Sequence, residues 1–154
     1  MKQVLVVGYG NSLRSDDAVG LYAVREMQKV GTRSNVEFLE MHQLQPELAE
    51  IMSRKDLVIF IDAAMHGISG ETRYEPVLPS SKTPEMSHST NPESLLFMAK
   101  ELYGHVPKAI LVTVAGECFG IGTKLSAEVE VAMKGVAVRA SQLIDEFLGA
   151  VVHA

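Results

Sequence analysis

A short apolar strand that runs straight into a glycine-rich polar loop constrains this chain most. Residues 4–7 read Val-Leu-Val-Val, and residues 8–20 read Gly-Tyr-Gly-Asn-Ser-Leu-Arg-Ser-Asp-Asp-Ala-Val-Gly. A continuous apolar run of this length is typical of a strand buried on both faces of a parallel sheet. Gly8 and Gly10 tolerate positive φ and close backbone approach, so the chain can turn sharply here. We therefore expect a buried strand whose carboxyl end opens into a polar loop.

The rest of the chain alternates between helix and strand patterns. Apolar residues recur every three or four positions in four segments, which predicts helices at 18–30, 43–54, 91–104 and from 126 onward. Short apolar runs predict further strands at 36–40, 57–61 and 109–114. Alternation with charged residues ahead of a proline predicts an edge strand at 72–77. Strands alternating with helices predict an α/β three-layer sandwich with a mostly parallel sheet and helices on both faces.

Length and composition narrow the class of protein. At 154 residues, we expect one domain, residues 1–154, that needs no disulfide or structural metal. Apolar residues make up 47% and charged residues 21%, which argues against a disordered or fibrous protein. One cysteine, no signal peptide and no bilayer-length apolar run predict a cytoplasmic protein without membrane insertion. A net charge of -5 without a basic cluster argues against a nucleic-acid partner.

Two adjacent acids, Asp16 and Asp17, lie where the helix at 18–30 should begin. A carboxylate at this place can cap the helix, because it accepts hydrogen bonds from free N–H groups and meets the positive end of the helix dipole. Only one acid is needed for that purpose. We assign the cap to Asp16, which leaves Asp17 as a candidate functional group.

Asp62 and His88 are the other two candidates. Asp62 directly follows the apolar run 57–61 and is expected to end that strand, where an acid is costly unless it is paired or liganded. His88 lies in a polar segment without periodicity. In open α/β sheets, ligands gather outside the carboxyl ends of the strands. We therefore expect Asp17, Asp62 and His88 to meet at one sheet edge, with the loop of Glu117 nearby.

Two carboxylates and an imidazole are suited to two kinds of chemistry. They can hold a divalent metal such as zinc or nickel with open positions for water or substrate. Alternatively, an aspartate can orient a histidine that moves a proton. His42, which follows the predicted strand 36–40, can reach the same edge. Cys118 has no neighbouring base in the sequence, and we expect it to be buried and inert.

Other common sites fit the sequence poorly. The first loop starts like a dinucleotide fingerprint, but Leu13 occupies the place of the third glycine, and the two aspartates would repel a pyrophosphate. No Gly-x-Ser-x-Gly nucleophile elbow occurs anywhere in the chain.

Several segments of the chain, taken in their order and at their spacing, resemble the hydrogenase maturation proteases. These are endopeptidases that trim the large subunit of NiFe hydrogenases. The resemblance begins with the signature at 8–20 and continues through Asp-Leu-Val-Ile-Phe-Ile-Asp-Ala-Ala at 56–64. It extends through Ser87-His88 ahead of a helix, Gly116-Glu117, and Gly122-x-x-Leu125-Ser126. It covers nearly the whole chain.

The resemblance implies a twisted, mixed five-stranded sheet between helical layers. It also implies removal of a carboxyl-terminal extension from a nickel-loaded large-subunit precursor. The family's nickel-contacting, catalytic residues carry over to Asp17, Asp62 and His88; the first is often glutamate in relatives, so Asp17 keeps the carboxylate with a shorter reach. The nickel would come with the substrate, zinc or cadmium could substitute for it, and the protein would hold no permanent metal of its own.

Two other functions stay open at this stage. The same three residues would suit a metal-dependent amidohydrolase with its own zinc or nickel, or a non-catalytic accessory protein that binds nickel or the precursor. Residues 41–48 depart from the family pattern, because Met-His-Gln-Leu-Gln-Pro-Glu-Leu stands where many members carry a small Gly-Thr pair. We expect this change to bear on which hydrogenase is served. We also expect the precursor's tail to bind in extended form near the polar segment 79–90.

Overall fold

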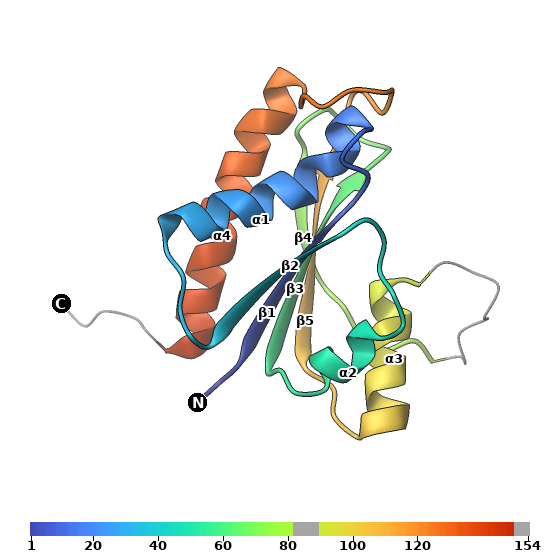
Figure 1. Ribbon diagram of the computed structural model, residues 1–154, viewed down its shortest axis with the longest axis vertical. Coiled ribbons are helices and arrows are strands. Elements are labelled where there is room, and N and C mark those ends of the chain that lie inside the picture. Colours follow the sequence, from blue (N-terminus) through green and yellow to red (C-terminus); the bar gives the residue numbers. More distant parts are fainter. Residues whose placement is uncertain (82–89, 150–154) are drawn as a thin grey trace.

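The computed structural model describes residues 1–81 and 90–149. In these residues a central sheet lies between two pairs of helices (Figure 1). The elements in chain order are β1 (Val4–Tyr9), the 3-10 helix η1 (Ser15–Ala18), α1 (Val19–Val30), β2 (Val36–Met41), α2 (Leu48–Met52), β3 (Leu57–Ala64), β4 (Thr72–Pro76), α3 (Pro92–Tyr103), β5 (Lys108–Ala115) and α4 (Ala127–Leu148). The three-layer α/β prediction is confirmed.

The sheet has five strands in the order β2-β1-β3-β5-β4. β1 pairs in parallel with both β2 and β3, and β3 pairs in parallel with β5. β4 lies antiparallel to β5 at the edge, as its charged pattern and nearby prolines predicted. The chain moves from β1 to one neighbour, β2, and then crosses to the other neighbour, β3. The carboxyl ends of β1 and β3 therefore form the switch point, where ligands bind in open α/β sheets.

Alternation along the strands divides the core into two halves. Val4 and Val6 point toward α1 and α4, whereas Leu5 and Val7 point toward α2 and α3, and all four are fully buried. β3 follows the same alternation, since Ile61 lies in the α1/α4 half with the other odd-numbered residues of that strand. The next residue, Asp62, is thereby directed to the side of α2 and α3.

Two predicted boundaries are wrong. The helix expected at 43–54 is only α2, because residues 45–47 form a turn in which the Pro46 carbonyl accepts a bond from the Ala49 amide. β3 does not end at Asp62 but continues to Ala64, because its backbone keeps pairing with β5. A strand depends on backbone hydrogen bonds, which a single acidic side chain at the rim does not remove.

The start of α3 matches its prediction closely. The Asn91 side chain accepts a hydrogen bond from the Ser94 amide at 2.8 Å, and Pro92 occupies the first helical position. Gly104 ends the helix with a left-handed φ of 73°. No helix in the described part of the chain is both long enough and apolar enough to span a membrane.

Candidate active site

A cleft of about 320 Å³ opens at the switch point of the sheet. Its walls come from residues that end or follow β1, β2 and β3 and from the start of α3. Asp17 and Asp62, predicted to meet at this edge, both line it, and so does His42. The prediction that the two acids converge is confirmed. His88 lies outside the described residues, as does most of the polar segment 79–90, so its role stays a prediction.

Three glycines of the first loop let backbone segments approach closely enough to bring the acids together. A Cβ atom on Gly8 would lie 2.1 Å from the Gly20 carbonyl oxygen, and one on Gly20 would lie 2.2 Å from the carbonyl oxygen of Ile61. A Cβ on Gly10 would meet the Asp17 carbonyl oxygen at 2.0 Å. None of these contacts leaves room for a side chain. The first turn of α1 therefore packs directly against β3, which places Asp17 near Asp62.

Asp17 is held by its own loop. Its Oδ2 accepts a hydrogen bond from the Asn11 amide at 2.7 Å, and its amide donates to the Arg14 carbonyl at 3.1 Å. The side chain of Asn11 in turn accepts from the Leu13 amide at 2.9 Å, which tightens the turn. Within the described residues Asp17 forms no ion pair with lysine or arginine, so its charge is left for something that enters the cleft.

Asp62 is half-buried, and its environment perturbs it strongly. Burial raises the pKa of the Asp62 carboxyl to about 7, and the nearby charge of Asp17 adds to the rise. Hydrogen bonds from the Ala63 amide, at 2.8 Å, and from the Tyr9 hydroxyl oppose it. The described residues supply no cationic partner for this acid. Two uncompensated carboxylates in one cleft repel each other unless they share a proton or a cation, which is typical of a functional site.

Asp16 does not cap the following helix, contrary to the prediction. Neither η1 nor α1 has a side-chain cap, and Asp16 is fully buried with its carboxylate directed at a loop about a hundred residues later. That carboxylate accepts from the amides of Glu117, Cys118 and Ser126 at 2.8, 2.9 and 2.7 Å, and from the Ser126 hydroxyl at 2.7 Å.

These hydrogen bonds set the charge state and the role of Asp16. Burial opposes ionisation, but the bonds outweigh it and hold the pKa of the Asp16 carboxyl below its ordinary value. Asp16 therefore links the loop that follows β1 to the loop between β5 and α4, at the carboxyl edge of the sheet. This link keeps its neighbour Asp17 in place. Both Glu117 and Cys118 are exposed, so the prediction of a buried cysteine is wrong.

Tyr9 also lines the cleft, and the sequence interpretation did not predict it. It is the last residue of β1, and it lines the cleft together with Asp62, whose carboxylate can accept a hydrogen bond from its hydroxyl. Side chains alternate between the two faces of the sheet along β1, so Leu5, Val7 and Tyr9 share one face. This pattern in the sequence could have predicted the position of Tyr9. Within residues 1–81 and 90–149, no three histidine, cysteine or acidic side chains are grouped closely enough to hold a metal.

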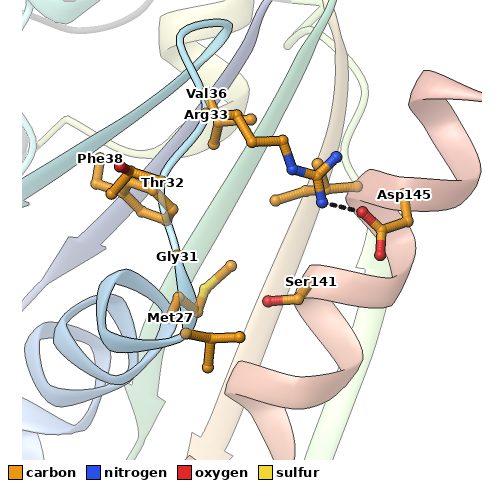
Figure 2. Close-up of a pocket in the computed structure, with 10 residues that line it drawn as sticks. Met27, Gly31, Thr32, Arg33, Val36, Phe38, Ser141 and Asp145 are labelled. Atoms are coloured by element: carbon orange, nitrogen blue, oxygen red, sulfur yellow. Dashed lines mark hydrogen bonds and ion pairs between the residues drawn. The ribbon is translucent and has the colours of Figure 1, made fainter. Parts of the chain in front are cut away.

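A second hollow of about 300 Å³ lies at the opposite, amino end of the sheet, between the end of α1, the start of β2 and α4 (Figure 2). Its charged groups satisfy each other, because Arg33 reaches across it to form an ion pair with Asp145 of α4. Apolar side chains such as Met27 and Phe38 make up much of the remaining wall. This hollow is therefore a weaker candidate for a reactive site than the cleft, whose two acids have no cationic partner among the described residues.

Solved structures of hydrogenase maturation endopeptidases share this fold along nearly the whole chain. The hydrogenase maturating endopeptidase HybD from E. coli matches with a TM-score of 0.76 and 22% identity, over 94% of this chain and 93% of that one. The NiFe hydrogenase maturation protease HycI from Thermococcus kodakarensis KOD1 matches with a TM-score of 0.74 and 20% identity, over 94% and 93%. A hydrogenase 2 maturation peptidase from a Thaumarchaeota archaeon matches with a TM-score of 0.66 and 24% identity, over 96% and 99%.

By sequence alone, no protein-family profile and no curated protein matches the chain. The likeness in three dimensions is nevertheless consistent across several proteins and covers all layers of the fold. The chain therefore has the fold of the hydrogenase maturation endopeptidases.

Proposed function

We propose that the protein is a hydrogenase maturation endopeptidase that removes the carboxyl-terminal extension of a NiFe hydrogenase large-subunit precursor. One observation carries this proposal: Asp17 of η1 and Asp62 of β3 line one cleft at the switch point of a sheet with this fold. Their convergence is what the sequence resemblance requires of two of its three site residues. The third is His88.

Nickel that is already bound in the precursor would serve as the recognition element. The two carboxylates lack cationic partners among the described residues, so a divalent ion that arrives with the substrate relieves their mutual repulsion. Carboxylate oxygens and an imidazole are suitable ligands for such an ion. A precursor without nickel offers no such compensation. Cleavage would then follow only after metal insertion, which makes it a check on assembly.

The chain allows His88 to join this site. Thr90 lines the cleft, and His88 precedes it by two positions along the chain, a span of at most about 7 Å. The amino terminus of α3, at Asn91 and Pro92, lies on the same wall and directs the positive end of its dipole at the cleft. The positive end of this dipole stabilises negative charge, both on the carboxylates and on any oxyanion that forms on the substrate.

Two routes for the chemical step follow from this arrangement. The substrate's nickel can polarise the scissile carbonyl, or it can lower the pKa of a bound water that attacks this carbonyl. In both routes Asp17, Asp62 and His88 hold the ion against the peptide. Among its described residues, the cleft wall contains no serine or cysteine that could act as the nucleophile.

The walls of the cleft also suggest where selectivity for one hydrogenase arises. His42 and Gln43 line it directly after β2, in the segment where the sequence departs from the family pattern. His42 and Gln43 are exposed, but the residues on either side of them are held in place. The Met41 carbonyl accepts a hydrogen bond from the Gly10 amide at 3.0 Å, and Leu44 is buried. We place the precursor tail against the side chains of His42 and Gln43.

Incubation with nickel-loaded and nickel-free precursor, followed by intact-mass measurement, tests the proposal. Loss of a carboxyl-terminal fragment from the loaded form alone is the expected result. Cleavage of simple amides with added zinc or nickel would instead indicate an amidohydrolase. Stable binding of the loaded precursor without any change in mass would indicate the non-catalytic accessory protein.

A further inference from the structure

Tyr9 and Asp62 are neighbours across two parallel strands. In the register of β1 and β3, Gly8 lies opposite Ile61, so the next pair along the strands is Tyr9 and Asp62. Side chains at such paired positions project from the same face of the sheet. Both residues line the candidate cleft. The strand register thus directs the tyrosine ring and the carboxylate to one place.

The Tyr9 hydroxyl lies among acids. The strand register and the shared cleft bring it to the Asp62 carboxylate, and Glu93 in the first turn of α3 is close enough to act on it electrostatically. Like any phenol near neutral pH, the hydroxyl carries its proton and acts as a hydrogen-bond donor.

Packing alone does not explain the hydroxyl. The Tyr9 ring packs against the core half formed with α2 and α3, and a phenylalanine ring would fill the same space. A polar group taken out of water is costly unless it has a partner. The partner here is a carboxylate of the candidate site rather than a backbone group.

We propose that Tyr9 is a positioning residue, whose hydroxyl, together with the Ala63 amide, fixes the Asp62 carboxylate so that it faces the metal of an incoming precursor. This inference rests on the proposed function. Two donors from different strands restrict rotation of the side chain, and the remaining oxygen lone pairs stay free for the ion. Asp62 then binds the nickel without first having to reorient.

Tyr9→Phe tests this role, and Tyr22→Phe is the matched control. The Tyr22 hydroxyl donates to the Thr123 carbonyl at 2.8 Å, so the control also loses one hydrogen bond but lies outside the cleft walls. For Tyr9→Phe we expect KM for nickel-loaded precursor to rise about tenfold, the usual size for a hydrogen bond to a charged group, with a smaller change in kcat. A variant damaged in its fold would instead lose kcat at unchanged KM. Tyr22→Phe should match the parent.

A second measurement needs neither metal nor substrate. The carboxyl carbon of Asp62 is followed by ¹³C NMR in the parent and in both variants at one pH. We expect its signal to move in Tyr9→Phe and to stay in place in Tyr22→Phe. An unmoved signal overturns the hydrogen bond itself, and unchanged kinetics with a moved signal overturns its role in the site. If the parent fails to cut loaded precursor, the proposed function fails, while the NMR signal still decides whether Tyr9 holds this carboxylate.

Discussion

Replacing Asp16 with alanine is expected to destabilise the protein far more than the same change at its neighbour Asp17. The Asp16 carboxylate is fully buried and is the acceptor for three backbone amides and one hydroxyl. Asp17 is partly exposed and accepts one bond, from the Asn11 amide. The two variants remove the same chemical group from adjacent positions, so the difference between them isolates the link between the two loops.

The size of the effect follows from the bonds that are lost. Each hydrogen bond to a charged group contributes about 1.5–3 kcal/mol, and water can replace the acceptor only where the donor reaches solvent. Glu117 and Cys118 are exposed, so their amides recover part of this energy, whereas Ser126 is less accessible. We estimate a loss of about 3–5 kcal/mol for Asp16→Ala and about 1 kcal/mol for Asp17→Ala. For a chain of this length, the larger loss lowers Tm by roughly 6–20 °C.

Urea unfolding and thermal melts of the parent and both variants at pH 7 measure these values. The pH dependence provides a further check. Because the pKa of Asp16 is lowered in the folded state, its stabilisation is present above the pKa of an unfolded aspartate, 3.8, and is lost as the pH falls through the folded value. The gap between parent and Asp16→Ala should therefore close in acid. A Tm for Asp16→Ala within 2 °C of that of Asp17→Ala at pH 7 would refute the reasoning.

Four further predictions concern the cleft and the glycines beneath it. Asp62→Asn and His88→Ala should each abolish trimming of nickel-loaded precursor in a mass assay, with far-ultraviolet circular dichroism unchanged; unfolding of either variant would indicate a structural role. Trimming by the parent should weaken as the pH falls below about 7, because protonation of Asp62 removes a ligand, and a flat profile from pH 5 to 8 would contradict this. The raised pKa also means that the ionised form of Asp62 opposes folding at higher pH, so Asp62→Asn should melt above the parent at pH 8 and lose this advantage toward pH 4. Gly20→Ala should destabilise the protein by more than about 3 kcal/mol, because the new Cβ would overlap the Ile61 carbonyl. Gly135 in α4 has open space around it, so Gly135→Ala should stabilise the protein by about 0.5–1 kcal/mol. Similar melting temperatures for the two variants would contradict the close packing at Gly20.

The fold was predictable because its signals are local. Uninterrupted apolar runs mark the buried strands, and charged alternation ahead of Pro79 marks the edge strand. The meeting of Asp17 and Asp62 was predictable for a related reason. Asp17 follows β1 and Asp62 lies near the carboxyl end of β3, and parallel strands bring their carboxyl ends to one edge.

The features that the sequence did not reveal depend on contacts between distant segments. Asp16 looks like a helix cap from its neighbours, but its partners lie in a loop about a hundred residues away. The role proposed for Tyr9 depends on the register between β1 and β3, which no single stretch of sequence specifies. Cys118 was expected to be buried because cysteine usually is, yet it lies on the exposed loop whose amides bind Asp16.

The most direct test of the proposed site is a crystal structure of the protein grown with zinc as a stand-in for the substrate's nickel, with the ion located by anomalous diffraction. We predict one strong peak in the cleft, about 2.0–2.2 Å from carboxylate oxygens of Asp17 and Asp62 and from an imidazole nitrogen of His88. A zinc ion held elsewhere, or one bound in the cleft with His88 well out of reach, would contradict the three-residue site.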